Sequence, residues 1–295
     1  MRGFVRTDGY SEAFLGGLLI GVELMRYVFM DEAGTSAVEP VSVVVGLIAD
    51  ADNHVMTGEA LALEVLKLLP AVVRQDFVFH ATNVFAGGKH RDLWSFNDRL
   101  AFLKFMMSIP RRVGMAICLG VHWRGAVDWS KESTPTTLTD AQTDHYLAFI
   151  NCVGVADRSI RRHAGPREVA TIVAEDIPEM RKQLKWGLHW LREQGIHLSP
   201  DHLRTTVADE EAGYLVQSGS LQVSRIRKAI HFVEKPDDPM VQVADACAYG
   251  FRRYFAGEKF GDDFAQAIMG DLSYLRMFAP PGGAECFWPL ENGFR

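Results

Sequence analysis

Two apolar segments of this chain, far apart in the sequence, each run directly into a pair of carboxylates. The first is YVFM, residues 27–30, which is followed at once by Asp31 and Glu32. The second is EVATIVAED, residues 168–176, whose last two residues are again acidic. Short apolar runs bounded by turn-forming residues are typical of buried β-strands. We therefore expect two core strands that each carry acidic side chains at the edge of the hydrophobic core.

The rest of the chain alternates between apolar runs and amphipathic stretches. Further strands are expected at 41–49, 76–81, 112–122 and 229–234, and helices at 57–73, 91–109, 137–163, 177–195 and 238–257. Pro110 is expected to end the second of these helices, and Pro178 to lie in the first turn of the fourth. Hairpin-like neighbours early in the chain and strand–helix alternation later favour an α/β (mixed α+β) fold, in which helices cover both faces of a mixed sheet.

Composition is that of an ordinary globular protein and restricts the possible partners only weakly. The chain has 295 residues, of which 48% are hydrophobic and 23% are charged, and its net charge is −6. That charge argues against a protein that coats nucleic acid, but not against a nuclease, because a metal site itself adds carboxylates. The four cysteines form no CxxC pair, so a zinc site is disfavoured and a reducing cytoplasm is expected.

The segment AFLGGLLIGVELM, residues 13–25, is the one leader-like stretch. It is shorter than the ~20 apolar residues of a membrane span and contains Glu23, so no membrane association is expected. Arg2 and Arg6 would suit a signal peptide, but no small-residue cleavage site precedes the first strand. A helix or loop packed on the domain is favoured, and Met25 as the true start of the protein stays open.

A third acidic position, Asp245, lies at the border of the apolar stripe of the last expected helix. Together with Asp31 and with Glu175 or Asp176, it gives three acidic positions on elements that are far apart in the sequence. Hard divalent cations prefer oxygen ligands, and two such ions can activate a water and stabilise the leaving oxygen of a phosphodiester. These residues predict a site for Mg²⁺ or Mn²⁺, although each acid alone also suits a turn, a helix cap or a surface ion pair.

Three segments resemble a known family. YVFMDEAG is similar to the Asp-Glu-Ser-Gly opening of the domain-of-unknown-function family numbered 3800, FHATN (79–83) to its His-Ala-Thr-acid segment, and DPMVQVADACAYGFRRY (238–254) to its closing Gln-x-Ala-Asp helix. The resemblance covers about residues 26–257 and implies a ribonuclease-H-like domain that acts as a metal-dependent nuclease. Residues 1–25 are then an N-terminal extension, and residues 258–295 a C-terminal helical or loop extension of the same domain.

The resemblance gives roles to the acids already singled out. Metal ligation falls to one acid from each of the three positions, which are Asp31, Glu175 or Asp176, and Asp245. Glu32 lies beside the first of these and is a further catalytic candidate. His80, in the FHATN segment, would position a water or contact a phosphate, although a histidine at the end of a strand is more often a structural residue.

Nucleic acid, DNA or RNA, is the expected partner of such an enzyme. Arg and Lys side chains pair with phosphates, and the basic clusters of this chain supply Arg161, Arg162 and Arg252 as candidates for substrate contact. The resemblance adds Gln242, which belongs to the closing motif. Charge clusters are also commonly solvated helix faces. The oligomeric state stays open.

Two positions depart from the family pattern. Asn83 stands where many relatives have an acid, and Ala33 where they have serine, so one metal ligand is missing or replaced. This leaves a second hypothesis, a catalytically silent protein of the same fold that binds nucleic acid or another partner. A phosphatase of the haloacid-dehalogenase type also places Asp after its first strand, but it needs a second Asp at the position that Ala33 occupies here, and it is disfavoured.

Overall fold

The centre of the molecule is a six-stranded mixed sheet with the strand order β7-β4-β1-β2-β3-β8. The computed structural model describes residues 25–74, 77–126, 138–165, 167–197 and 220–288. The strands of this sheet are β1 (Met25–Ala33), β2 (Val41–Asp50), β3 (Ala116–Trp123), β4 (Val169–Glu175), β7 (Ile226–Val233) and β8 (Gly282–Phe287). β1 and β7 run parallel to β4, β2 runs antiparallel to β1 and β3, and β8 runs antiparallel to β3. A second, two-stranded sheet pairs β5 (Ile196–His197) with β6 (Ser220–Leu221).

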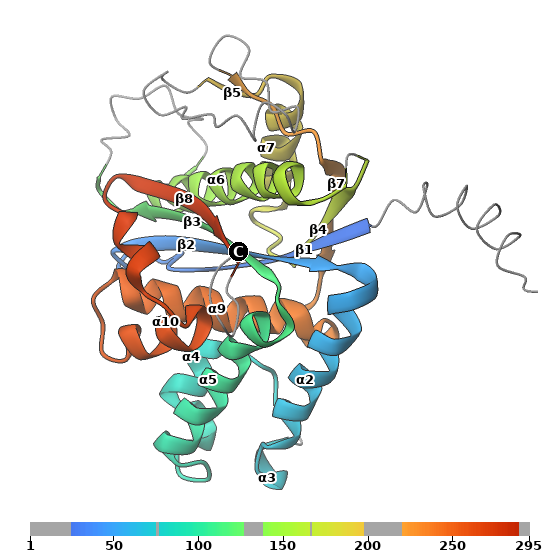
Figure 1. Ribbon diagram of the computed structural model, residues 1–295. Helices are drawn as coiled ribbons and strands as arrows, with labels where there is room; N and C mark the ends of the chain where they lie inside the picture. The colour runs from blue at the N-terminus through green and yellow to red at the C-terminus, as the bar shows by residue number, and fades with distance from the viewer. Residues whose placement is uncertain (1–24, 75–76, 127–137, 166, 198–219, 289–295) are drawn as a thin grey trace, which may run out of the picture.

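Helices cover both faces of the large sheet (Figure 1). One face carries α6 (Asp140–His163) and α7 (Arg181–Glu193), and the other carries α9 (Pro239–Phe255), around which α2 (Met56–Lys67), α5 (Phe96–Val113) and α10 (Gly261–Met269) pack. The short helical segments are η1 (Ala51–Val55), α3 (Ala71–Arg74), α4 (Ala81–Ala86), η2 (Gly88–His90), η4 (Lys235–Asp237) and η5 (Ser273–Met277). The expected mixed α/β class is confirmed. Among the described helices, none has the length and apolar character to cross a bilayer.

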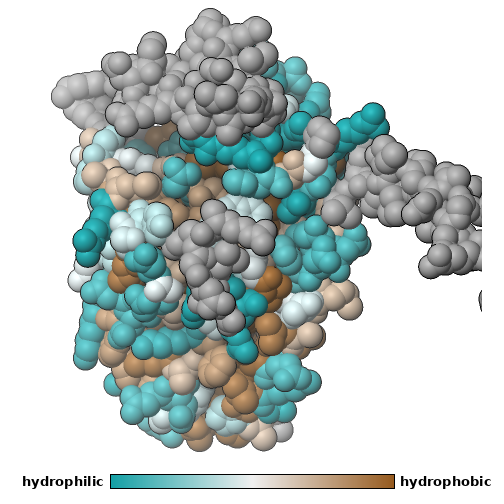
Figure 2. All heavy atoms as spheres, in the orientation of Figure 1, coloured by the Kyte–Doolittle hydropathy of each residue, from teal (hydrophilic) through white to brown (hydrophobic). Residues whose placement is uncertain are grey.

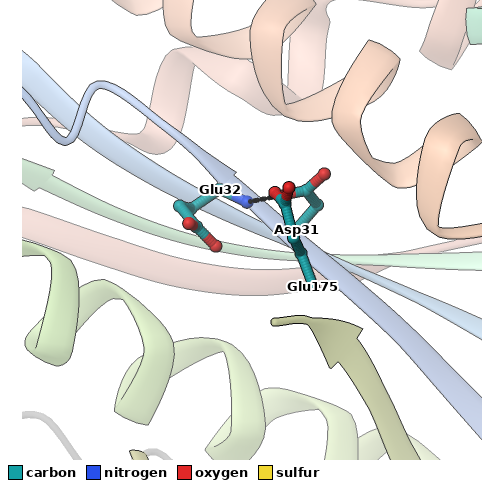
Figure 3. A group of neighbouring side chains, drawn as sticks. All are labelled: Asp31, Glu32 and Glu175. Carbon is teal, nitrogen blue, oxygen red and sulfur yellow. Dashed lines mark hydrogen bonds between the residues drawn. The ribbon is translucent and has the colours of Figure 1, made fainter. Parts of the chain in front are cut away.

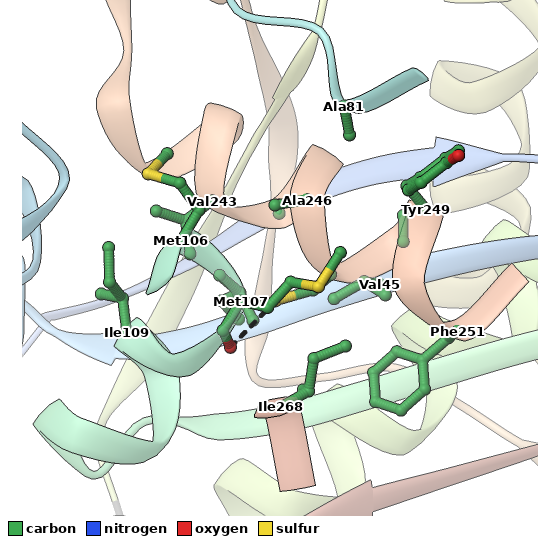
Figure 4. Packing of buried hydrophobic residues seen from close by; sticks show 14 of the residues in the cluster. Val45, Ala81, Met106, Met107, Ile109, Val243, Ala246, Tyr249, Phe251 and Ile268 are labelled. Atoms are coloured by element: carbon green, nitrogen blue, oxygen red, sulfur yellow. Dashed lines mark hydrogen bonds between the residues drawn. The ribbon is translucent and has the colours of Figure 1, made fainter. Parts of the chain in front are cut away.

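Alternation of side chains along the strands gives the sheet a separate core on each face. In β1, Val28 and Met30 belong to the core beneath α6 and α7, while Phe29 belongs to the core beneath α9. β2 is buried along its whole length, as expected for a central strand that is covered on both sides. Figure 4 shows part of the α9-side core, in which Val45 of β2 and Phe251 of α9 lie in one apolar cluster.

The surface in Figure 2 is mixed, with hydrophobic side chains visible at the end of the molecule that α2, α3 and α5 form. Leu63, Leu68 and Phe105 are among the exposed large hydrophobic residues of these segments.

The single helix expected at 57–73 is two helices in the structure. α2 ends at Lys67, and α3 begins just after Pro70, which has no backbone N–H with which to continue the first helix.

The strand expected at 76–81 is wrong within the described residues 77–81. Residues 77–80 form no strand and pair with none of the sheet, and Ala81 begins α4. The rings of Phe77 and Phe79 instead pack against Phe102 of α5, at centroid distances of 6.2 and 6.1 Å. An alternating apolar pattern satisfied by packing on a helix therefore mimics the pattern of a half-buried strand.

Prolines mark two further differences from the sequence predictions. Pro110 lies inside α5, which continues to Val113. The helix is capped by Gly114, which has a φ of 83° and whose N–H donates a hydrogen bond to the Pro110 carbonyl. The expectation that Pro110 ends this helix is wrong: the proline lacks the N–H that would bond the Met106 carbonyl, yet the helix continues for three more residues to Val113. Pro178 precedes α7, which begins only at Arg181, and so does not lie in its first turn.

The leader-like segment, residues 13–25, lies outside the described residues apart from Met25.

The chain beyond residue 257 contributes an edge strand that the sequence analysis does not predict. β8 pairs with β3, and the register places Cys286 directly opposite Cys118. Both thiols are free, and their Sγ atoms lie 2.7 Å apart. Residues 258–288 therefore complete the same sheet, so the last strand of the described chain is β8 and not the segment around 229–234.

Because of this contact, we expect hydrogen peroxide to join Cys118 to Cys286 in the folded protein, with loss of one hydrogen from each thiol and formation of water. Non-reducing peptide mapping should recover the linked pair. A Cys286→Ser variant should lose this product, whereas Cys247→Ser should keep it, because Cys247 is buried on the α9 side of the sheet. Recovery of a Cys118–Cys152 link as the main product would contradict the expectation.

Candidate functional site

The alternation that builds the two cores also sorts the first acid pair. β1 continues through both acids to Ala33, so the pair lies inside the strand and not beyond its end. Asp31 has the same parity as Phe29 and enters the α9 side of the sheet. Glu32 has the same parity as Met30 and enters the α6 side. The two neighbouring carboxylates thus enter opposite faces of the sheet at one end of β1.

β4 brings Glu175, and not Asp176, to this place. β4 runs parallel to β1 with its last residues beside Asp31, and Glu175 has the parity of Val173, which faces α9. Asp176 turns away and forms an ion pair with Arg181, whose hydrogen bond lowers the pKa of that carboxyl. Of the two acids that the sequence leaves open, only Glu175 joins the cluster.

Three carboxylates gather at this end of the sheet (Figure 3). Asp31, Glu32 and Glu175 each offer one oxygen atom, and these atoms all lie within 4.8 Å of one another. Asp31 is 1% exposed, and its Oδ1 accepts a hydrogen bond from the Glu32 N–H at 2.8 Å. A fourth acid, Asp245 of α9, is 2% exposed, and its Oδ2 accepts the Ala81 N–H at 3.1 Å.

A buried lysine that the sequence analysis does not single out lies among these acids. The Nζ atom of Lys235 is 2.9 Å from Asp31 Oδ2, 2.7 Å from Glu175 Oε2 and 3.2 Å from Asp245 Oδ2. These contacts show directly that the three acids expected to share a metal converge on one point. Lysine is usually exposed and follows no apolar periodicity, so nothing in the sequence pattern marks this one.

Gln242 supports the turn that carries this lysine. Its side-chain Nε2 donates a hydrogen bond to the main-chain carbonyl of Lys235 at 2.9 Å, and the residue is only 4% exposed. It lies one helical turn before Asp245 on α9. The structure therefore gives Gln242 a contact with η4, whereas the sequence analysis expects a contact with substrate.

Burial and mutual repulsion make the acids hold protons strongly. Burial raises the pKa of Asp31 well above its ordinary value, and the charge of Asp245 adds to the effect. Burial also raises the pKa of Asp245, although Lys235 opposes this. Burial by itself would lower the pKa of Lys235, but Asp31, Asp245 and Glu175 outweigh it and raise that pKa, so the ammonium stays charged.

His145 of α6 is the neighbour of Glu32 on the opposite face of the sheet. Its Nε2 lies 3.7 Å from Glu32 Oε2, and its side chain is 4% exposed. Burial lowers the pKa of His145 to about 4, so the imidazole is neutral at pH 7. Burial, reinforced by the charge of Glu175, raises the pKa of Glu32 to about 8. Nothing in the sequence pattern marks His145, because it lies inside a long amphipathic helix with no motif around it.

His80 lies at the rim of the cluster. Its Nδ1 is 3.7 Å from Asp245 Oδ2, and its side chain is 50% exposed, so it faces both the acids and solvent. It is the N-cap residue of α4, whose first N–H group binds Asp245. Asn83, where relatives of the resembled family have an acid, is exposed on the same short helix.

The three arginines predicted to contact substrate do not lie beside the acids. Arg161 and Arg162 lie near the C-terminal end of α6, about 24 Å along the helix axis from His145. The Arg161 Nε pairs with Asp157 at 2.7 Å.

Arg252 lies two turns beyond Asp245 and is 6% exposed. It pairs with Glu258 and, at 3.4 Å, with Glu39. Its guanidinium is thus engaged within the fold. None of the three arginines has the placement beside the carboxylates that a contact to the reacting phosphate would require.

The donor set suits a hard divalent cation. Carboxylate oxygens from Asp31, Glu32, Glu175 and Asp245 are the ligands that Mg²⁺ and Mn²⁺ prefer. Asp31 Oδ2 is buried and accepts no hydrogen bond within the described residues, and it faces the ammonium of Lys235. A cation therefore fits the charge and chemistry of this place.

No protein-family model, no curated protein and no solved structure matches this chain at a significant level. Any function assigned to the site therefore rests on its own chemistry and on the motif resemblance.

Proposed function

We propose that this protein is a Mg²⁺- or Mn²⁺-dependent nuclease that hydrolyses phosphodiester bonds in DNA or RNA. The observation that carries the proposal is the convergence of Asp31, Glu175 and Asp245 within 3.2 Å of one nitrogen atom, from two strands and a helix. Burying several carboxylates together costs free energy, which favours a functional role over a structural one. The motif resemblance supplies the substrate class.

The same proposal assigns the chain to the domain-of-unknown-function family numbered 3800 and its sheet to the ribonuclease-H-like type. In support, the strands β3, β1, β4 and β7 share one direction, β2 and the edge strand β8 run opposite to them, and the acids lie on the adjacent parallel strands β1 and β4. A reducing, cytoplasmic setting is part of the proposal and accords with four free cysteines.

In this proposal each residue has a distinct role in binding the ion or the substrate. Asp31, Glu175 and Asp245 would hold the ion, with Glu32 as a neighbouring carboxylate. When bound, a divalent ion stabilises negative charge on a phosphate oxygen and makes a bound water more acidic. The chain keeps these carboxylates buried and in fixed orientations. His80 at the exposed rim, 3.7 Å from Asp245, is the side chain placed to contact substrate from solvent and to transfer a proton.

The direct test is an assay of labelled single- and double-stranded DNA and RNA with Mg²⁺, Mn²⁺ or EDTA. We expect cleavage of at least one substrate that depends on the metal and stops in EDTA. A folded protein that cuts none of these substrates with either metal would contradict the proposal.

A divalent ion is also expected to stabilise the folded protein near neutral pH. It would relieve the repulsion among the acids, and binding to the native state at a hundred times the dissociation constant contributes about 2.7 kcal/mol. Differential scanning calorimetry with and without millimolar Mn²⁺ measures the effect, and Ca²⁺-free EDTA buffer is the reference. An unchanged melting temperature in both Mg²⁺ and Mn²⁺ would count against a metal site.

A catalytically silent binding protein is the second candidate, and Lys235 is the observation that favours it. Its ammonium already balances part of the negative charge, as a purely structural ion-pair network would. Such a protein should retain nucleic acid in a filter-binding assay, cut nothing, and bind Mn²⁺ no better than an Asp31→Asn variant.

A further inference from the structure

We propose that Lys235 is the resident counter-cation of the carboxylate centre and that a divalent ion must displace its ammonium in order to bind. The identity of the competing ion rests on the proposed function, whereas the counter-cation role rests on the ion pairs themselves. In consequence, the wild-type protein binds metal more weakly than its four acids would permit.

The geometry of the ammonium carries this inference. Three carboxylates lie within 2.7–3.2 Å of Lys235 Nζ, so acidic oxygen atoms surround the ammonium. The side chain is 6% exposed and is therefore not a surface lysine that happens to lie near an acid. A small cation bound to the same oxygen atoms would lie against this nitrogen, where two positive charges repel strongly in a buried setting.

The main chain holds the lysine in this place. Lys235 begins η4, one residue beyond Glu234, which follows the end of β7, and Pro236 restricts the next backbone position. Gln242 donates to the Lys235 carbonyl at 2.9 Å, while Asp245, one turn further along α9, contacts the ammonium at 3.2 Å. One face of α9 thus contacts both the main-chain carbonyl and the side-chain ammonium of Lys235. This assigns Gln242 a positioning role: it fixes the turn from which the ammonium reaches the acids.

The test removes the charge and keeps the length of the side chain. We expect Lys235→Met to bind Mn²⁺ at least about tenfold more tightly than wild type in isothermal titration calorimetry, because its competitor is gone. In EDTA the same variant should melt about 10 °C lower, since it leaves buried carboxylates without a partner. Mn²⁺ should restore most of that loss. The matched control is Lys228→Met on β7, whose lysine is 66% exposed and pairs with Glu193 away from the acids, and it should change neither value.

A second variant covers the case in which Lys235→Met does not fold. Gln242→Leu keeps every charge but frees the Lys235 carbonyl, so Mn²⁺ should bind a few times more tightly than to wild type. If wild type binds Mn²⁺, weaker or unchanged binding in both variants overturns the displacement, and a Lys235→Met protein with wild-type stability in EDTA overturns the counter-cation role. If Lys235→Met loses stability but neither it nor wild type binds Mn²⁺, the counter-cation role stands and the proposed metal-dependent function fails.

Discussion

Replacing Glu175 with Gln is expected to lower metal-dependent hydrolysis by about a hundredfold, the upper end of what is seen when a metal site loses a supporting group, whereas Asp176→Asn leaves it nearly unchanged. The two acids are adjacent in the sequence, but Glu175 is the last residue of β4 and enters the cluster, whereas Asp176 follows the strand and turns away from it. Glu175 lies 2.7 Å from Lys235 within the cluster, and Asp176 is paired with Arg181 outside it. Each substitution keeps the size of the side chain and removes one negative charge, but only Glu175→Gln removes a carboxylate of the cluster, so the pair separates the effect of position from that of charge.

The measurement is a single-turnover cleavage rate at saturating Mn²⁺, with melting temperatures to show that both proteins are folded. Asp31→Asn, on the neighbouring strand, should behave like Glu175→Gln. Mn²⁺ affinity should fall with the rate in these two variants and stay unchanged in Asp176→Asn. Equal losses of activity in Glu175→Gln and Asp176→Asn would mean that the cluster is not the reaction centre.

The contrast between these neighbours also explains which parts of the site the sequence can predict. The apolar runs before both acid pairs identify β1 and β4, and the position of Asp245 beside an apolar stripe identifies a helix that packs under them. Side chains alternate with a period of two residues, so a one-residue uncertainty in where a strand ends exchanges one face for the other. The choice between Glu175 and Asp176 therefore needs the register of β4 against β1.

Other parts of the site have no local signal. Lys235 reaches the acids because a short turn connects β7 to α9, and the three contacts join residues that are far apart in the chain. His145 meets Glu32 only because α6 lies on the sheet face opposite α9. Long-range juxtapositions of this kind depend on how the elements pack, which composition and periodicity do not specify.

The fold shows the same division between local and long-range information. Strong apolar runs flanked by turn residues give β2 and β4 to within a residue or two of their bounds, and a capping box at Thr139 and Gln142 marks the start of α6. β8 is missed because its sequence, GGAECF, has two glycines and little apolar character, and only pairing with β3 makes it a strand.

Stability should fall as the pH rises toward 8 in the absence of metal, and Glu32→Gln should remove a large part of that fall. The pKa of Glu32 in the folded protein is about 8 against an ordinary value of 4.5, because burial and the charge of Glu175 disfavour the ionised form. The folded state therefore binds this proton more tightly than the unfolded state does. By linkage, the free energy of unfolding decreases with pH between about 4.5 and 8, by an amount on the order of 4 kcal/mol for this one group.

Urea unfolding in EDTA at pH 5, 6.5 and 8 measures the effect. Glutamine has the shape of the protonated acid and cannot ionise, so Glu32→Gln should match wild type at pH 5 and exceed it clearly at pH 8. Asp31, whose pKa is also raised by burial, keeps some of the slope in the variant. Glu64→Gln, at a side chain that is 72% exposed, is the control and should follow wild type at every pH. If the free energy of unfolding changes with pH equally in wild type and Glu32→Gln, Glu32 is ionised at neutral pH without a metal. The repulsion among the buried carboxylates is then much weaker than their burial implies.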